Sequence, residues 1–224
     1  MGRKITDGPI RNRERTMNKL LEAVGEIIRT EGHTKLGVNH VARTAGVSKK
    51  LIYRYFGSLN ELIEMYIRTK DFWVGKRASV DELVERNHAD KGRHLAHSLL
   101  SEFVDYLEHS PETQKAVLWE ISQRNKPMRV VSAMREEIGE ELFGLTDPAF
   151  ERTGVDLRAI VAILTGGLYY LTLRAHSCGG TFCGIDVGTD KGKERITDAV
   201  DRIVDWSFDR AEKNPISRNM SPPV

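Results

Sequence analysis

Four basic or hydroxyl-bearing side chains within residues 38–56 are suited to binding a polyanion. They are Lys49, Lys50, Tyr53 and Arg54. At about 100° per residue, all four fall on one side of a helix and apolar residues fall on the other. Cationic groups bind phosphate oxygens, and a phenol hydroxyl donates to phosphates or base edges. The spacing therefore predicts a helix that contacts DNA through its basic face.

The residues before this helix predict a second short helix, joined to it by a tight turn. Val41, Ala42 and Ala45 follow helical spacing, and the two alanines allow another helix to cross closely. Gly46 lies at the turn, where glycine adopts positive φ without steric cost, and Ser48 is suited to cap the next helix. Two helices joined in this way form a helix-turn-helix, whose second helix docks in the DNA major groove.

A basic amphipathic helix taken alone is more often a solvated surface than a DNA contact. The alanine–glycine turn, the capping serine and the basic second helix occur together much more rarely by chance, so the DNA-binding interpretation is favoured. Seven residues are predicted to contact DNA: Asn39, Ser48, Lys49, Lys50, Leu51, Tyr53 and Arg54.

The segment from about Arg15 to Tyr66 resembles the N-terminal domain of the TetR/AcrR-type transcriptional regulators. The most specific part is the run AGVS-x-x-x-IY-x-x-F over residues 45–56. Further matching residues are Leu20, Ala23, Ile27, Gly32, Val41, Ala42 and Leu62. The resemblance implies an all-α protein with an N-terminal three-helix helix-turn-helix DNA-binding domain. It also implies a C-terminal helical domain for ligand binding and dimerisation.

Three positions depart from the pattern that is common in this family. Gly37 stands where Ser or Thr often opens the second helix, and glycine is a tolerable cap there. Leu51 replaces a frequent Thr in the recognition helix, and Leu59 replaces a frequent Lys at the start of the fourth helix. Leucine touches a thymine methyl but bonds no phosphate. Backbone N–H groups near Ser58 could supply the phosphate contact instead.

Charge is distributed unevenly along the 224 residues. Residues 1–56 hold 12 Lys and Arg and 5 Asp and Glu, a net charge of +7, whereas the remainder holds 22 basic and 27 acidic residues, a net charge of −5. A basic end on an acidic body suits a protein that presents one end to a polyanion. A nonspecific DNA binder is more often basic throughout.

The chain divides into four expected segments. They are a disordered basic arm (1–12), the DNA-binding domain (13–71), the ligand-binding and dimerisation domain (72–213) and a disordered tail (214–224). Outside the motif, helices are expected at about 14–30, 58–75, 79–87, 91–109, 112–124, 126–144, 153–177 and 191–213. Gly32 is expected to end the first helix, Ser58 and Glu61 to form a capping box, and residues 146–148 to form a loop.

Two long helices near the C-terminus carry the argument for an oligomer. Residues 155–173 are apolar nearly all round, with Gly166 and Gly167 allowing close approach, and the last helix has an apolar stripe. The resemblance implies a homodimer through helices 153–177 and 191–213; the alternative is that both complete a monomer core. A two-fold dimer would place its recognition helices about 34 Å apart on a palindromic operator.

The resemblance also implies a cavity for an unknown small-molecule effector. Eight residues are candidates for its lining, although each is more often ordinary core or surface: Phe103, Trp119, Glu120, Gln123, Met128, Met134, Tyr169 and Tyr170. No metal or other cofactor is expected. Only His94 and His97 of the histidines between 88 and 109 share a helix face, and no third ligand is evident.

Cys178 and Cys183 are the only cysteines, and both fall in a glycine-rich loop. In a reducing compartment we expect two free thiols, with redox or metal sensing as the alternative. The polar, basic N-terminus is not a secretory signal. The apolar stretch at 159–173 is shorter than a bilayer span, so we expect no membrane association and a cytoplasmic location.

Taken together, these patterns predict a ligand-responsive transcriptional regulator, specifically a repressor that a small-molecule effector releases from its operator. A DNA-binding protein of chromosome organisation is a second hypothesis. An enzyme is a third, but the sequence contains no nucleophile elbow, phosphate loop, paired-carboxylate signature or metal motif. We therefore expect no enzymatic activity.

Overall fold

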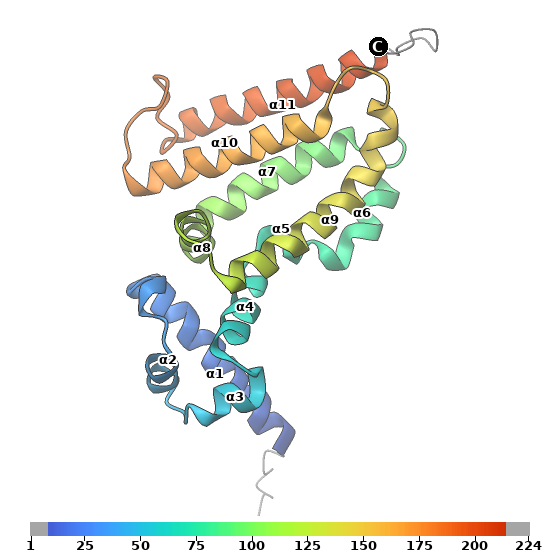
Figure 1. Ribbon diagram of the computed structural model, residues 1–224. Coiled ribbons are helices and arrows are strands. Elements are labelled where there is room, and N and C mark those ends of the chain that lie inside the picture. The colour runs from blue at the N-terminus through green and yellow to red at the C-terminus, as the bar shows by residue number, and fades with distance from the viewer. Residues whose placement is uncertain (1–8, 214–224) are drawn as a thin grey trace, which may run out of the picture. The chain divides into compact units, whose positions relative to one another are not determined.

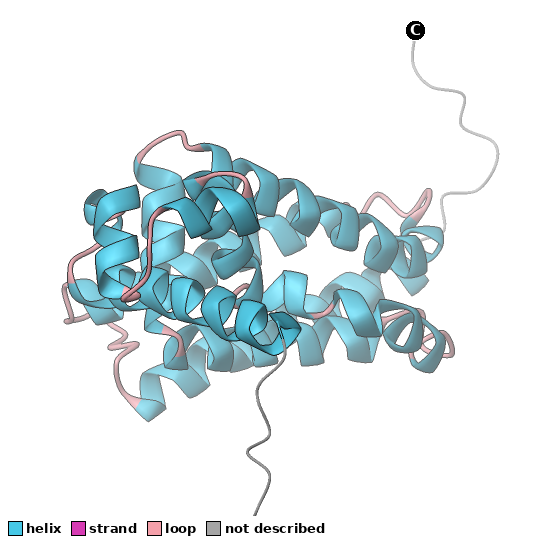
Figure 2. Ribbon diagram, turned by 90° about the horizontal axis from the view of Figure 1, so that it is seen from below, coloured by secondary structure: helices cyan, strands magenta, loops and turns pink. Residues whose placement is uncertain are grey.

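The computed structural model describes residues 9–213, and these consist of helices and loops (Figure 2). Over this range no strand is formed, and Phe182 and Ile185 make one isolated bridge in a turn. The all-α prediction is confirmed. Residues 1–8 of the expected arm and the expected tail at 214–224 lie outside the described residues.

The described chain divides into two units. The first contains the residues up to Gly75 together with Ser110–Arg135, and the second contains Lys76–His109 and the residues from Glu136 onward. Residues 110–135 therefore pack with the N-terminal helices, which their sequence pattern did not predict. One helix, α9 (Lys126–Phe150), contributes to both units.

The helices of the first unit share one apolar core. Figure 1 labels these helices along the chain. Leu20, Val24 and Ile27 of the first helix are nearly inaccessible to solvent, and they pack with Ile52 and Leu62. The elements are α1 (Pro9–Thr30), a 3₁₀ turn (His33–Lys35), α2 (Val38–Thr44), α3 (Lys50–Phe56), α4 (Leu59–Thr69), α5 (Phe72–Gly75) and α8 (Pro111–Ser122), with the start of α9.

The predicted start of α1 is wrong, whereas its predicted end is correct. The helix begins at Pro9, earlier than the expected start near Glu14, because proline is tolerated in the first turn of a helix. Its expected end is confirmed: Gly32 adopts a φ of 84°, and its N–H donates to the carbonyl of Ile27 at 2.9 Å. Glycine reaches this conformation without the steric cost of a side chain.

The prediction that the fourth helix continues to Gly75 is wrong, because α4 ends at Thr69. The carboxylate of Asp71 is almost fully buried and accepts from the backbone N–H of Val74 at 3.0 Å, which caps α5. The same carboxylate pairs with Arg135 at 2.6 Å. A tertiary ion pair thus holds the break between α4 and α5.

The second unit is a bundle of long helices. α7 (Arg93–His109) packs against both α10 (Leu157–Ser177) and α11 (Asp190–Lys213). The unit also holds a 3₁₀ turn (Arg77–Ser79), α6 (Val80–Arg86) and the C-terminal part of α9.

The prediction of a loop at 146–148 is also wrong, because α9 continues through these residues to Phe150 with Pro148 inside the helix. A proline removes one backbone hydrogen bond, but the helix ends two residues later, so the loss falls in the last turn. Asp147 in this turn pairs with Arg158 of α10 at 2.7 Å, and Arg158 also binds Glu140. These ion pairs tie the end of α9 to the start of α10.

α10 is longer than the apolar stretch recognised in the sequence. By length and composition alone, this 21-residue helix could cross a membrane. The expectation that the apolar stretch at 159–173 is too short for a bilayer span is therefore corrected. In the single chain it buries one face through Leu157, Leu164 and Leu168. Its opposite face is uncovered, with Ile163 74% exposed and Tyr170 53% exposed.

Candidate nucleic-acid interface

The turn between α2 and α3 has the geometry that the sequence predicted. Gly37 precedes α2 with extended dihedral angles, as expected for its cap position. Gly46 adopts a φ of 65°, and the N–H of Val47 donates to the carbonyl of Ala42 at 3.0 Å. The backbone thereby closes α2 and turns directly into α3.

The start of α3 differs by one residue from the expectation. Ser48 was expected to cap a helix beginning at Lys49, but α3 begins at Lys50. The hydroxyl of Ser48 accepts from the backbone N–H of Lys50 at 3.4 Å, which is long for a hydrogen bond. The carbonyl of Ser48 accepts from Leu51 at 3.0 Å, so a tight first turn leads into the helix.

The division of α3 into an apolar and a basic face is confirmed. Ile52 is fully buried in the core of the first unit, and Phe56 is 8% exposed. Tyr53 is 54% exposed on the other side. The remaining polar residues of the predicted contact set are exposed as well: Asn39, Ser48, Lys49, Lys50 and Arg54. Their contact with DNA remains a prediction.

Two of these exposed residues contact each other across the turn. The Nζ of Lys49 donates to the Oδ1 of Asn39 at 3.2 Å, which links the start of α3 to α2. This hydrogen bond restrains the lysine side chain before any partner arrives. The sequence named both residues but gave no signal for the pairing, because their separation of ten residues matches no helical repeat.

The ring of Tyr55 in α3 contacts two arginine side chains. The guanidinium groups of Arg13 and Arg54 lie 5.6 and 5.8 Å from the centre of its ring, within the range of cation–π attraction. Arg13 belongs to α1, which begins before the expected helix start near Glu14. The fold therefore places an α1 cation beside Arg54 at the edge of α3, which sequence spacing alone does not indicate.

The two leucines that depart from the family pattern have a structural role. Leu51 and Leu59 are half-buried and pack against the core of the first unit. Ser58 caps α4 as expected, since its hydroxyl accepts from the N–H of Glu61 at 3.2 Å. The apolar side chains at residues 51 and 59 extend the core towards the interface.

The eight candidate effector-binding residues do not gather in one unit. Five lie in the first unit: Trp119, Glu120, Gln123, Met128 and Met134. Trp119 stacks on the ring of His33 at 5.0 Å, and Glu120 pairs with Arg135 at 2.8 Å. The other three lie in the second unit: Phe103, Tyr169 and Tyr170.

A cavity of about 250 Å³ lies between α7, α10 and the start of α11 in the second unit. Its lining includes Val104, Leu168 and Ile196, and the ion pair between Glu108 and Lys193 lies at its wall. None of the eight candidates lines this cavity. Sequence reasoning missed its lining residues because they follow the same apolar spacing as ordinary core.

Within residues 9–213, no group of three acidic, histidine or cysteine side chains is arranged to hold a metal ion. Cys178 and Cys183 are exposed free thiols. Cys183 adopts a φ of 51°, an uncommon conformation for a residue other than glycine.

The fold and this interface define an all-helical helix-turn-helix protein. Residues 20–65 match the model of the tetR family of bacterial regulatory proteins. This match places the N-terminal domain in that family, and the whole chain has the fold of TetR/AcrR-family regulators.

Solved structures support the fold assignment. NalD of Pseudomonas aeruginosa, the secondary repressor of a multidrug efflux pump, aligns with a TM-score of 0.59 and 20% identity over 85% of this chain and 96% of its own. A TetR-like regulator from Rhodococcus sp. RHA1 aligns with a TM-score of 0.55 and 19% identity over 91% of this chain and 99% of its own. RolR in complex with resorcinol aligns with a TM-score of 0.50 and 17% identity over 95% of this chain and 98% of its own. Comparison with curated protein sequences finds no match.

Proposed function

We propose that this protein is a sequence-specific DNA-binding transcriptional regulator. The observation that carries the proposal is the exposed basic face of α3, which a tight turn holds in a domain of the tetR family. Lys49, Lys50 and Arg54 would bind phosphates or base edges in the major groove, and Tyr53 would add a hydroxyl donor. Such a regulator acts where the DNA is, so we propose a cytoplasmic location.

We further propose that the regulator is a homodimer through α10 and α11. Ile163 and Tyr170 of α10 and Trp206 of α11 expose apolar side chains, and Trp206 is 65% exposed. A Cβ placed on Gly166 or Gly167 would meet no atom within 4 Å apart from its chain neighbours and the backbone of its own helix, so this face has room for another backbone. A second copy would remove this apolar surface from water. Two-fold symmetry then predicts a palindromic operator.

The regulatory output that we propose is repression relieved by a small molecule. NalD is a repressor and RolR binds resorcinol, and these properties belong to those proteins. In this chain the effector would bind more tightly to a dimer whose two recognition helices are spaced so that they do not fit the operator. DNA binding then weakens by that difference in affinity. The eight predicted residues remain candidates for contact with an effector, five of them in the first unit and three in the second.

The first test is fluorescence anisotropy of the full chain on DNA upstream of its own gene, compared with scrambled DNA over a salt series. Selective binding that weakens with salt supports a specific regulator. Equal, weak binding to both DNAs at every salt concentration would instead favour a nonspecific DNA organiser. Loss of the selective signal on adding candidate effectors then tests ligand release.

The double variant Lys49→Ala/Tyr53→Phe tests the assigned helix face. Each side chain is expected to contribute on the order of 1 kcal/mol through a phosphate contact. The double variant should therefore bind about 10- to 30-fold more weakly. Lys126→Ala, which removes an exposed lysine of α9, is the matched control and should bind like the wild type. Wild-type affinity in the double variant would show that another surface contacts DNA.

A further inference from the structure

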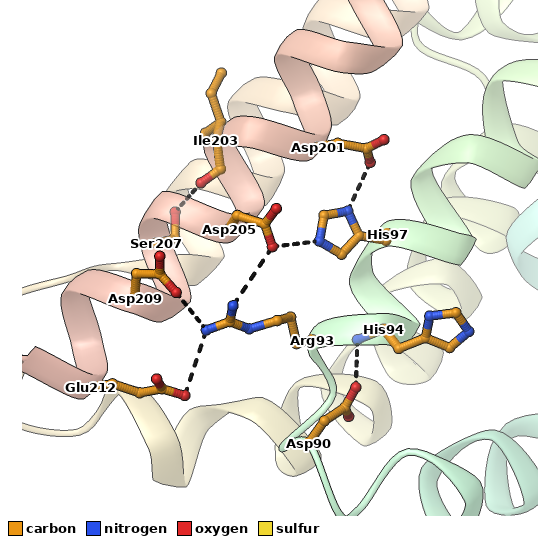
Figure 3. Close-up of polar contacts among 10 residues, drawn as sticks. All are labelled: Asp90, Arg93, His94, His97, Asp201, Ile203, Asp205, Ser207, Asp209 and Glu212. Atoms are coloured by element: carbon orange, nitrogen blue, oxygen red, sulfur yellow. Dashed lines mark hydrogen bonds and ion pairs between the residues drawn. The ribbon is translucent and has the colours of Figure 1, made fainter.

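Two charged rows face each other where α7 packs against α11 in the second unit. Arg93 and His97 lie four residues apart on α7, and Asp201, Asp205 and Asp209 repeat at the same interval on α11. Residues four apart share one face of a helix. Figure 3 shows both basic side chains reaching the row of carboxylates. The contact between α7 and α11 is therefore partly ionic.

His97 is held by a carboxylate at each ring nitrogen. Its Nδ1 lies 2.7 Å from the Oδ1 of Asp201, and its Nε2 lies 3.0 Å from the Oδ1 of Asp205 (Figure 3). An ionised carboxylate only accepts hydrogen bonds, so both nitrogens must donate. A neutral imidazole carries one N–H, whereas the imidazolium carries two. The geometry is satisfied in full only by protonated His97.

We infer that His97 is a proton-dependent clamp between α7 and α11, which holds two carboxylates when protonated and releases one of them as the pH rises. The inference concerns the packing of these two helices, and it does not rest on DNA binding.

The charges around His97 favour the protonated form. Glu212 extends the row of three aspartates on α11. This acidic row faces two cations, His97 and Arg93. α10 also packs on α7, but it has no Asp, Glu, Lys, Arg or His between Arg158 and Arg174. Four carboxylates thus surround two cations, so the local charge is negative even when His97 is protonated.

The pKa of His97 reflects two opposing effects. Partial burial lowers the pKa, but hydrogen bonds and charge attraction from Asp201 and Asp205 together outweigh it. The pKa of His97 is consequently raised above its ordinary value of about 6.5. At a given pH near neutrality, a larger fraction of His97 is therefore protonated than of an unperturbed histidine.

Loss of the proton affects the two carboxylates differently. Asp205 keeps Arg93, whose Nη1 lies 3.7 Å away. Among the described residues, Asp201 pairs with His97 alone. A neutral ring donates to one carboxylate and turns a nitrogen lone pair towards the other. Because Arg93 can retain Asp205, the deprotonated clamp leaves α11 attached through fewer charged contacts.

The direction of the pH effect follows from linkage. A histidine with a raised folded pKa contributes its full stabilisation below the unfolded pKa of about 6.5. This contribution is lost as the pH rises through the folded pKa. The packing of α11 on α7 is therefore strongest on the acidic side of neutrality, provided that the aspartates stay ionised.

An NMR titration of the imidazole nitrogens in the full wild-type chain tests the clamp directly. The His97 resonances are assigned by their absence in His97→Gln. We expect His97 to titrate above pH 6.5 with both nitrogens protonated below that point, and Asp201→Asn to lower its titration midpoint. A midpoint at or below 6.5 in the folded wild type would overturn the inference.

Thermal unfolding between pH 6 and 9 provides the second measurement. The wild type should lose more of its Tm over this range than His97→Gln, because the raised pKa of His97 makes its stabilisation disappear as the pH rises. His94→Gln is the matched control, because His94 lies on the same helix with its ring pointing away from α11 (Figure 3). It should keep the wild-type pH dependence. Equal slopes in all three proteins would contradict the clamp.

Discussion

At the scale of single residues, the polar contacts of this protein depend on partners that are distant in the sequence. Asp71 lies almost fully buried at the break between α4 and α5, and its partner Arg135 follows 64 residues later. Lys49 and Asn39 pair across a turn, and Arg13 and Arg54 share the ring of Tyr55. The residue types were visible in the sequence, but their pairings depend on how the helices cross.

The ion pair of Asp71 leads to a stability prediction. Arg135→Met should lower the free energy of unfolding by about 3–5 kcal/mol, because it leaves a buried carboxylate without its cation. Chemical denaturation measures this loss.

Adding Asp71→Asn should recover most of the loss, since an amide keeps the capping hydrogen bond to Val74 and carries no charge. If the double variant is as unstable as Arg135→Met, packing of the arginine stem outweighs the buried charge.

At the scale of elements, close approach of helices decides where small residues are needed. α1 and α4 pack together, and a Cβ built on Gly25 of α1 would lie 2.7 Å from the Cζ of Tyr66. Gly25 thus gives the tyrosine ring its space. Helix propensity alone marks this glycine as a defect, because it lies in the middle of a helix.

Gly25→Ala should therefore destabilise the protein. Overpacking costs about 1–3 kcal/mol, whereas the gain in helix propensity is about 1 kcal/mol at most. We expect a net loss of about 1 kcal/mol in denaturant unfolding. Gly139→Ala in α9 is the control, because its Cβ meets its nearest neighbour, Phe143, at an ordinary 3.9 Å. A Gly25→Ala variant as stable as Gly139→Ala would show that Tyr66 moves aside freely.

At the scale of the whole molecule, exposed apolar surface is the feature that the single chain leaves unexplained. Ile163 and Trp206 are among its most exposed large apolar side chains. A second copy of the chain would cover them, in line with the proposed dimer. The long apolar helix α10 then has two buried faces, one in its own unit and one against the partner.

Ile163→Asp should dissociate the proposed dimer, because it would bury an unpaired charge in the interface. Sedimentation velocity should show a monomer, and affinity for a two-site operator should fall at least tenfold. Ile121→Asp on α8 is matched in type and in exposure, at 73%. It should remain dimeric. A dimeric Ile163→Asp variant would place the interface elsewhere, whereas a monomeric wild type would show that α10 and α11 only complete a monomer core.

Local signals were sufficient for the helix-turn-helix and for most helix ranges. The Gly46 turn, the Ser58 cap and the Gly32 helix end each depend on a few neighbouring residues, so they can be read from the sequence. The apolar period of α3 likewise determined which face is buried. Such features were predictable because their physical causes lie within about one helical turn of the chain.

Other features were decided only by the tertiary structure. The break after Thr69 depends on Arg135, and the continuation of α9 through Pro148 accompanies the ion pair between Asp147 and Arg158. The two carboxylates on His97 come from a helix about a hundred residues later. These energies arise from contacts between distant segments, and no local pattern of propensity, spacing or charge encodes which segments will meet.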